Sequence, residues 1–329
     1  MEKSLIAKFE TYAREPILRK MGDGTLICTF LTGGDNEPEN NNYVSYSKSY
    51  DDGKTWTEPK ILFEHTKRGV WCTEIFTEWE YPLAFIHTYS ASCNTHYREL
   101  LTYYSESRDN GETWSEPKTV PGHINGCSVR QGITLSNGDT MFPIYWQECL
   151  SIFEYRYVWG SKKANWKFRC GAGVLPKGEK YFQRFGYIAN DDIELWEPNA
   201  VEIENGHIIM YIRTNTGFLH YSESFDYGRT WGELKKMDIP HSDTKITCLK
   251  VKDTVLLINN SVATGRTHLE ISKSKDGINF EHICFIQDKE DRFFYPHAFA
   301  DDEKKILYVA YENAKEHFLG KFTYEELGI

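Results

Sequence analysis

Four arginines of the chain lie in strand-like segments and are candidates for a shared role. Arg14 lies in YAREPIL, Arg130 in SVRQGITL, Arg213 in MYIRTN and Arg266 in GRTHLEISKSKDG, each within or beside a strand-like run. A single arginine in such a segment is most often structural or solvated. Several guanidinium groups that meet could hold one carboxylate by charge-assisted hydrogen bonds, each contributing about 1.5–3 kcal/mol. The chemistry that they would serve is recognition of an anionic small molecule.

A tyrosine and several carboxylates lie in comparable segments. Tyr295 stands in FFYPHAFADD and Glu197 in WEPNAVEIENG, and the loop TGGDNEPENNN at 32–42 offers Asp35, Glu37 and Glu39. A phenol has a reference pKa of about 10, so a tyrosine needs a base beside it before it can attack as a nucleophile. Carboxylates can act as that base or as a general acid. Tyr295 is one of 21 tyrosines, so only its position can single it out.

Metal and cofactor chemistry is not indicated. His87, Cys93 and His96 fall in IHTYSASCNTHYREL (86–100), which we interpret as an irregular insertion whose spacing matches no zinc pattern. The eight cysteines form no CxxC pair, and most follow or interrupt apolar strand-like runs. This usage favours reduced, buried thiols in a cytoplasmic protein. We expect no metal and no cofactor.

The elements that must position these residues are repeated. SKSYDDGKTW (47–56) returns as SESRDNGETW (105–114), SESFDYGRTW (222–231) and SKSKDGINF (272–280). The aspartates Asp51, Asp109, Asp226 and Asp276 are separated by 58, 117 and 50 residues. The middle gap is two periods, so we expect a degenerate copy near SKKANW (161–166). A period of this length divides 329 residues into about six units.

Each unit also carries a turn followed by a β-rich run. These runs are GDGTLICTF (22–30), SNGDTMFPIYW (136–146), ENGHIIMYIR (204–213), KDTVLLINN (252–260) and DEKKILYVAY (302–311). With the short runs around each repeated phrase they give four strands per unit and leave no long amphipathic helix. The pattern predicts an all-β fold, a six-bladed β-propeller that forms a single domain over residues 1–329. The sixth unit has three strands, so SLIAKFE near the N-terminus is expected to supply its fourth and latch the ring.

The repeated phrase itself is best interpreted as a structural turn. Gly53, Gly111 and Gly228 supply backbone freedom, while the aspartate, serine and threonine can satisfy backbone groups. The tryptophan can bury a large ring between neighbouring sheets. A calcium loop is the alternative, but the EF-hand spacing and its terminal glutamate are missing.

The bulk composition limits the partners. The formal net charge is −10, with 48 acidic against 38 basic residues. This balance disfavours nucleic acid or an anionic membrane as the main partner, although clustered arginines could still bind an anionic small substrate. The N-terminal sequence has no apolar signal region, and no run approaches a membrane span. We therefore expect a cytoplasmic protein that acts on a small molecule.

The repeated phrases resemble the Asp-box (BNR) repeats of the sialidase superfamily, which are six-bladed propellers. The likeness extends over essentially the whole chain. Arg14 in YAREPIL resembles the Arg-Ile-Pro motif of sialidases, with Glu15 in place of isoleucine. The resemblance implies that Arg14, Arg213 and Arg266 bind a substrate carboxylate, and Arg130 is a further candidate for substrate contact. It also implies that Tyr295 is the nucleophile and Glu197 its base.

The resemblance implies a retaining exo-glycosidase that releases a terminal anionic sugar, most simply sialic acid, from an oligosaccharide or glycoside. A tyrosine nucleophile suits a sugar whose anomeric carbon bears a carboxylate, because the phenol approaches that charge in neutral form. The family uses an aspartate as general acid/base in the loop where this chain offers Asp35, Glu37 and Glu39. Counting back from the repeated phrase favours Glu37.

Two alternatives remain from the sequence. A related propeller could cleave another sugar, such as an arabinan or a rhamnose or uronate glycan, as a hydrolase or as a lyase, and His297 beside Tyr295 is compatible with this. A non-catalytic propeller that binds acidic glycans is the other alternative. The presence of both Tyr295 and Glu197 disfavours it, because a binding protein does not require a nucleophile and a base.

Overall fold

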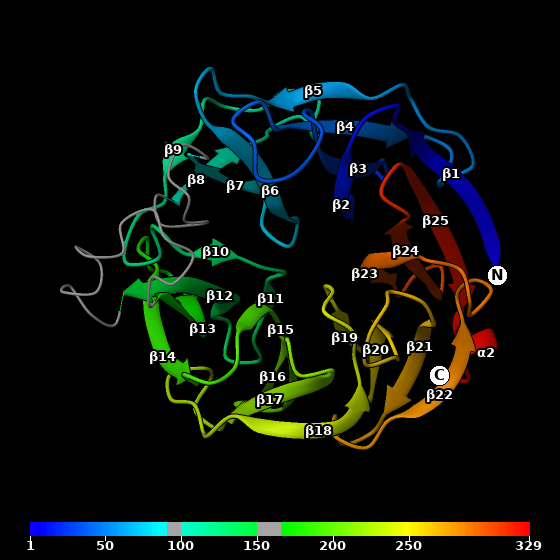
Figure 1. Ribbon diagram of the computed structural model, residues 1–329. Helices are drawn as coiled ribbons and strands as arrows, with labels where there is room; N and C mark the ends of the chain where they lie inside the picture. Colours follow the sequence, from blue (N-terminus) through cyan, green and yellow to red (C-terminus); the bar gives the residue numbers. More distant parts are fainter. Residues whose placement is uncertain (91–99, 150–165) are drawn as a thin grey trace.

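The computed structural model of the chain describes residues 1–90, 100–149 and 166–329. Six antiparallel sheets stand around a central axis, as Figure 1 shows. The protein is a nearly all-β, six-bladed propeller, which confirms the fold predicted from the repeats. The innermost strand of each sheet lies beside the axis and the outermost strand lies on the rim.

The strands of the first three sheets follow the chain. They are β2 (Ala13–Lys20), β3 (Leu26–Thr32), β4 (Tyr43–Ser49) and β5 (Lys60–Phe63); β6 (Gly69–Phe76), β7 (Leu83–Tyr89), β8 (Leu101–Glu106) and β9 (Lys118–Thr119); and β10 (Ser128–Val129), β11 (Ile133–Thr134), β12 (Thr140–Cys149), β13 (Trp166–Leu175) and β14 (Gln183–Ala189). In the third sheet, β10 and β11 both pair with β12 and share the inner position.

The remaining three sheets complete the ring. They are β15 (Leu195–Glu204), β16 (His207–Thr214), β17 (Phe218–Ser224) and β18 (Lys235–Pro240); β19 (Thr247–Val251), β20 (Thr254–Asn260), β21 (Leu269–Ser274) and β22 (Glu281–Phe285); and β23 (Phe294–Asp301), β24 (Ile306–Glu312), β25 (Glu316–Thr323) and β1 (Glu2–Lys8). The short helix α2 (Tyr324–Leu327) follows the last strand. No helix in the described ranges has the length and apolarity of a membrane span.

The N-terminal strand closes the ring, as the sequence predicts. β1 pairs antiparallel with β25 over Glu2↔Lys321 to Lys8↔Glu316 and forms the outer edge of the sixth sheet. Ile6 of β1 is buried against the first and sixth sheets. Because strands from the two ends of the chain share one sheet, ring closure depends on residues far apart in sequence.

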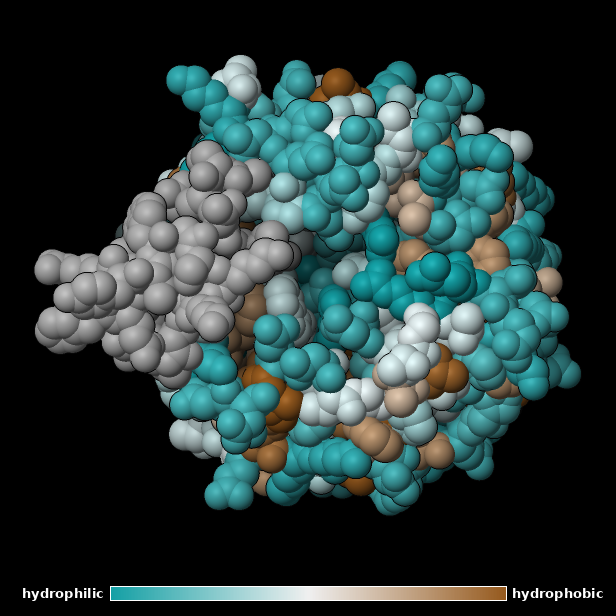
Figure 2. Space-filling view, in the orientation of Figure 1, coloured by the Kyte–Doolittle hydropathy of each residue, from teal (hydrophilic) through white to brown (hydrophobic). Residues whose placement is uncertain are grey.

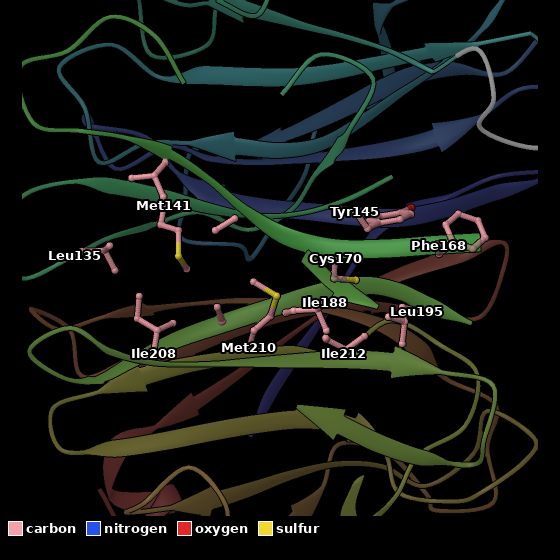
Figure 3. Packing of buried hydrophobic residues seen from close by; sticks show 13 residues of the cluster. Leu135, Met141, Tyr145, Phe168, Cys170, Ile188, Leu195, Ile208, Met210 and Ile212 are labelled. Carbon is pink, nitrogen blue, oxygen red and sulfur yellow. The ribbon is translucent and has the colours of Figure 1, made fainter. Parts of the chain in front are cut away.

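The apolar core lies between neighbouring blades. Each of the six interfaces between adjacent sheets holds its own cluster of buried aliphatic and aromatic side chains. Figure 3 shows the interface of the third and fourth sheets, where Met141 and Cys170 face Ile208 and Met210. The alternating apolar runs of the sequence form these clusters, because successive strand residues point to opposite faces of a sheet.

The repeated phrase forms the turn between the third and fourth strands in four sheets. We call these the box turns, residues 49–56, 107–114, 224–231 and 274–280. In the first, Asp51 accepts hydrogen bonds from the amide and hydroxyl of Thr55 at 2.9 and 2.6 Å, and Ser49 Oγ accepts from the amide of Gly53 at 2.8 Å. The bonds from Thr55 hold the pKa of Asp51 at about 2. These contacts confirm the predicted structural role.

Each box turn also fastens its blade to the preceding one. Gly53 has φ +81°, and a Cβ at this position would lie 2.3 Å from Leu319 Cδ2 of the sixth sheet. Asp52 accepts a hydrogen bond from the Tyr308 hydroxyl of the same sheet at 2.7 Å. Glycine is therefore required for close approach as well as for its positive φ. The tryptophan of the turn, Trp56, packs against the same interface.

One repeat was assigned to the wrong connection. SKKANW lies mostly at 161–165, outside the described residues, but Trp166 opens β13, the third strand of its sheet. The turn between the third and fourth strands of that sheet is 176–182, with the sequence PKGEKYF. A Ser-x-Asp pattern is absent from this turn, so the third and fourth strands of the third sheet are connected without the repeated phrase. The error arose because the second connection of this blade is long.

The cysteines agree with the thiol prediction as far as they are described. Cys28, Cys72, Cys127, Cys170 and Cys248 are free and buried, and Cys284 is free and half-buried. Cys93 and the side chain of Cys149 lie outside the described part of the chain.

Candidate active site

A polar pocket opens at the centre of the ring. Its volume is about 230 Å³, and it is lined by Glu15, Glu37, Pro38, Trp71, Thr73, His87, Leu100, Ser128, Arg130, Tyr145, Trp196, Glu197, Arg213, Arg266 and Tyr295. The inner strands and the loops at one end of the propeller supply these residues. Figure 2 shows that the centre of the ring is hollowed and hydrophilic. Six of the seven residues singled out from the sequence line this one pocket; Arg14 lies beside it.

The inner strands aim the functional side chains by a shared distortion. β2, β15 and β23 each slip register where they pass the pocket, between Arg14 and Ile17, between Trp196 and Asn199, and between Phe294 and His297. Such bulges redirect side chains and are frequent at active sites.

The residues at the bulges have unusual backbone angles. Glu15, Glu197 and Tyr295 have φ of +53°, +39° and +53°, and each is followed by a proline. A positive φ is costly for a residue with a side chain and persists only where the surrounding structure imposes it. All three side chains line the pocket, so the strain coincides with the site.

Arg213 on β16 contacts three other polar residues at the pocket. Its Nη1 donates to Glu197 Oε2 at 2.6 Å and to the Tyr295 hydroxyl oxygen at 3.1 Å. Its Nε and Nη2 contact Asp243 Oδ1, both at 2.7 Å. The guanidinium thus joins the phenol of β23 and the carboxylate of β15, which are 98 residues apart in sequence.

The other two arginines flank the same tyrosine. The guanidinium carbons of Arg14 and Arg266 lie 5.8 and 5.4 Å from the centre of the Tyr295 ring. Arg14 Nε also lies 3.8 Å from the buried carboxylate of Glu312. Burial raises the pKa of Glu312 to about 8, against the opposing effect of Arg14. The fold therefore brings Arg14, Arg213 and Arg266 around one phenol.

Glu37 is the loop carboxylate that reaches the pocket. It lies between β3 and β4, the second and third strands of the first sheet, and lines the pocket together with Pro38. Asp35 is exposed, and Glu39 accepts from the amide of Asp35 within the loop. Burial raises the pKa of Glu37, and the charges of Glu15 and Glu197 add to this; the contact with Tyr12 opposes it.

Glu197 and Tyr295 have opposite electrostatic surroundings. Burial alone would raise the pKa of Glu197, but the charges of Arg213 and Arg130 outweigh it and lower the pKa below its ordinary value. Burial raises the pKa of Tyr295, and the nearby Glu197 raises it further, against Arg213. At neutral pH the pocket therefore pairs an ionised carboxylate with a protonated phenol.

The sequence reasoning did not recognise Glu15 as a pocket residue. Arg130 Nη2 donates to Glu15 Oε1 at 2.5 Å, and Lys245 Nζ lies 3.9 Å from the same oxygen. All three side chains are buried. Burial lowers the pKa of Lys245 to about 8, and Glu15 partly opposes this effect. The position of Glu15 before Pro16 could have revealed it, since Glu197 and Tyr295 also precede prolines.

The placement of His87 in an irregular insertion was wrong. It lies within β7, is 1% exposed and lines the pocket. Its Nε2 faces the amide of Val129 at 3.2 Å and Thr73 Oγ1 at 2.7 Å. His96 and Cys93 lie outside the described residues. No group of three or more potential metal ligands occurs in residues 1–90, 100–149 and 166–329.

A second cavity of about 690 Å³ lies at the other end of the central channel. Two ion pairs lie in its wall: Arg19 Nη2 contacts Glu74 at 2.7 Å, and Lys20 contacts Asp301 at 2.7 Å. It contains no tyrosine. The smaller pocket is therefore the candidate active site, because the strained residues and the arginines meet there.

The fold and the site together define a class. The protein is a six-bladed propeller with box turns on its sheets and a charged pocket at the mouth of its channel. It belongs to the BNR repeat-like domain family, whose model matches residues 24–308.

The chain is similar to proteins described as sialidases. A sialidase from Bacteroides fragilis (strain YCH46) is 22% identical over 323 residues, which cover 83% of this chain and 54% of the relative. The chain thus spans about half the length of that curated relative. The structure of Hadza microbial sialidase Hz136 has a TM-score of 0.76 at 16% identity, covering 96% of this chain and 66% of that one.

A protein of unknown function from Dyadobacter fermentans DSM 18053 has the same fold. Its TM-score is 0.74 at 17% identity, and the match covers 98% of this chain and 97% of the other. At this level of identity the structural likeness shows the fold alone.

Proposed function

We propose that the protein is a glycoside hydrolase that releases a terminal anionic sugar, sialic acid in the simplest case, with retention of configuration. The observation that carries this proposal is the meeting of Arg14, Arg213 and Arg266 around Tyr295, with Glu197 bound to the same nitrogen of Arg213. The similarity to sialidases supports the reaction class.

In this proposal the arginines bind the sugar carboxylate. Three guanidinium groups can share one carboxylate by charge-assisted hydrogen bonds, which fixes the anomeric carbon near the phenol. Arg213 is already held by Asp243, whose side chain is 59% exposed. The substrate carboxylate shares the guanidinium with Asp243 or displaces it, which an exposed carboxylate permits at low cost.

Tyr295 is the proposed nucleophile and Glu197 its base. The phenol oxygen attacks the anomeric carbon while its proton passes to the carboxylate of Glu197. The low pKa of Glu197 keeps that carboxylate ionised before the reaction. Arg213 donates to the phenol oxygen, so it stabilises the negative charge that develops there.

Glu37 is the proposed general acid and base. Its raised pKa keeps a proton available for the leaving oxygen as the glycosidic bond breaks. The same carboxylate then takes a proton from the water that attacks the glycosyl-tyrosine, and Tyr295 leaves and regains its proton from Glu197. The atoms balance without a cofactor.

The proposal predicts that Tyr295→Phe abolishes turnover. Removing the attacking oxygen leaves binding intact, so we expect the kcat of an aryl α-sialoside to fall by several orders of magnitude with a small change in ligand affinity. Release of the aryl alcohol measures kcat, and NMR of the first sugar anomer measures retention. Tyr181→Phe is the matched control, because Tyr181 is 65% exposed and lies on a turn away from the pocket.

Two outcomes would refute the proposal. Wild-type protein that binds but never cleaves any sialoside would identify a binding protein. An unsaturated product that absorbs in the ultraviolet would identify a lyase. A Tyr295–His297 lyase pair is disfavoured, since the buried His297 accepts from the Leu18 amide and lies outside the pocket lining.

A further inference from the structure

Asp243 contacts the pocket from the connection 241–246 between β18 and β19, which runs from the rim of the ring to its axis (Figure 1). Ser242 and Thr244 on either side of it are buried, and the Thr244 amide donates to the Ser242 carbonyl oxygen at 2.7 Å. The backbone is therefore held in a tight turn, whereas the side chain of Asp243 is 59% exposed. This side chain can change its position without a movement of the loop.

All three nitrogens of Arg213 contact other groups of the protein. Nη1 contacts Glu197 Oε2 and the Tyr295 hydroxyl oxygen, at 2.6 and 3.1 Å. Nε and Nη2 both lie 2.7 Å from Asp243 Oδ1. These two nitrogens form an edge of the guanidinium that can bind a carboxylate by two parallel hydrogen bonds. Asp243 therefore occupies a carboxylate-binding edge of Arg213.

The Nε–Nη2 edge is also the one that a substrate carboxylate needs in the proposed reaction. The opposite edge includes Nη1. A carboxylate bound there would compete with Glu197, the proposed base, and with the Tyr295 oxygen, whose developing charge Arg213 stabilises. Binding at Nε and Nη2 leaves both contacts of Nη1 intact. A ligand carboxylate that binds this edge competes with Asp243.

The carboxylate partners of the arginines differ in whether a ligand can replace them. Glu197, which contacts Arg213, is buried. Glu312, which lies beside Arg14, is also buried. Separating a buried carboxylate from its arginine leaves an uncompensated charge, which is strongly unfavourable. The exposed carboxylate of Asp243 is solvated when it turns away, and exposed ion pairs contribute little to stability. Asp243 is therefore the partner that a ligand can replace.

Arg266 contacts the backbone of the same residue. Its Nη2 donates to the Asp243 carbonyl oxygen at 3.1 Å. Asp243 thus contacts two of the three arginines proposed to bind the sugar, Arg213 through its carboxylate and Arg266 through its carbonyl group. The contact with Arg266 does not involve the carboxylate, so it persists when the side chain of Asp243 rotates into solvent.

We propose that Asp243 is a built-in competitor for the carboxylate of the ligand. Its own carboxylate occupies the Nε–Nη2 edge of Arg213 until an anionic sugar replaces it there, and it then turns into solvent. This exchange weakens binding of the sugar carboxylate and speeds release of the acid product. The inference rests on the proposed function, because it takes an anionic sugar as the ligand.

Binding of the 2,3-unsaturated analogue of sialic acid tests this exchange, because the analogue keeps the carboxylate and has no leaving group. Calorimetry measures its Kd for the wild-type protein and for Asp243→Ala. We expect the Kd of the variant to be lower by about 2- to 5-fold, the range for loss of a competing exposed ion pair. The methyl ester of the analogue has no charged carboxylate, so its Kd should be the same for both proteins.

Turnover of an aryl α-sialoside separates competition from a structural role. If Asp243 competes, the KM of Asp243→Ala falls by the same factor as the Kd, and kcat does not rise. If Asp243 only holds Arg213 in position, its removal raises KM and Kd and lowers kcat, which overturns the proposal.

Two further variants complete the test. Asp238→Ala is the matched control, because Asp238 is exposed and lies on β18, the outer strand of the fourth sheet. It removes one negative charge away from Arg213 and should leave the Kd unchanged; an equal gain in affinity would identify a general charge effect and overturn the proposal. Asp243→Asn keeps the size of the side chain without its charge, and it decides if Asp243→Ala fails to fold.

The outcomes separate the competitor from the hydrolase. Cleavage by the wild-type protein with unchanged or weaker binding by Asp243→Ala overturns the competitor and leaves the hydrolase. Tighter binding of the acid by the variant, when neither protein cleaves a sialoside, supports the competitor while the hydrolase fails. Absence of binding by both proteins overturns both proposals.

Discussion

At the scale of single residues, the two carboxylates proposed for catalysis differ in their surroundings. Glu197 contacts Arg213 and has a lowered pKa, whereas burial raises the pKa of Glu37. Glu197 must be ionised to act as a base, so activity is lost as the pH falls through its low pKa. Glu37 must be protonated to act as an acid, so activity is lost as the pH rises through its raised pKa. A bell-shaped kcat/KM profile is expected.

Glu37→Gln should remove the alkaline limb of that profile. The variant cannot protonate the leaving group, so we expect about a 10²- to 10⁴-fold loss on an unactivated sialoside. The loss should be much smaller for an aryl glycoside whose phenol leaves without help. Steady-state kinetics over a range of pH values measure both effects. Glu39→Gln is the comparison within the loop, and an equal loss in that variant would contradict the assignment of Glu37.

The residues of the site differ in how far the sequence could predict them. Arg213 and Tyr295 could be named from the sequence because the resemblance to sialidases assigns roles to residues at their positions relative to the repeats. Glu15 and His87 are single residues in unrelated segments. They line one pocket because β2 bulges and because β7 pairs with β6, the innermost strand of its sheet. Contacts across a ring depend on such local distortions, which hydrophobic periodicity does not encode.

At the scale of elements, the glycine of a box turn has two roles. It adopts a positive φ, and it leaves room for close contact with the preceding blade. Gly228 has φ +81°, and a Cβ there would lie 2.7 Å from Met141 Sδ of the preceding sheet. Gly24 has φ +91° but would meet nothing within 4 Å. Comparing alanine substitutions at Gly228 and Gly24 therefore separates the stability lost through the backbone conformation from the stability lost through the steric clash.

Gly228→Ala should destabilise the fold more than Gly24→Ala. Both variants incur about 1 kcal/mol from a positive φ, and overpacking at Gly228 adds about 1–3 kcal/mol. Unfolding by urea with a fluorescence readout measures the difference. Equal losses would show that the box glycine serves the turn alone.

The elements themselves were largely predictable, because turns and alternating runs recur with a fixed period. The exception was the third blade, where SKKANW was taken for a box although Trp166 begins the third strand. Its β12 and β13 are ten residues each, and the connection between them is long. A long connection moves the strands that follow it to higher residue numbers. A turn located from the repeat period alone is therefore assigned to the wrong residues.

At the scale of the whole molecule, stability depends on closing the ring. β1 contributes the outer strand of the sixth blade, and Ser4 Oγ donates to the carbonyl of Gly53 in the first blade at 2.6 Å. The strand therefore joins the sixth blade to the first, because the chain runs from β1 directly into β2. The periodic count of strands predicted this latch, since the last unit lacked one.

Deleting residues 1–10 should lower the melting temperature by about 10 °C or more, because several kcal/mol of pairing and burial are lost. Differential scanning calorimetry measures the change. Ser4→Ala removes only the contact with Gly53 and should lower the temperature by a few degrees at most. An unchanged melt after the deletion would show that the remaining five complete blades hold the ring closed unaided.

The α-amino group of Met1 lies 2.6 Å from Glu326, so residues 1 and 326 are neighbours on the outer rim. A short peptide bridge there would make the backbone a continuous circle, which could then be cut in a turn of another blade. Such a circular permutant would keep the pocket residues in place, while a different sheet would contain the strands from the two ends of the chain. A fusion partner attached at either terminus would project from that same rim, outside the mouth of the channel.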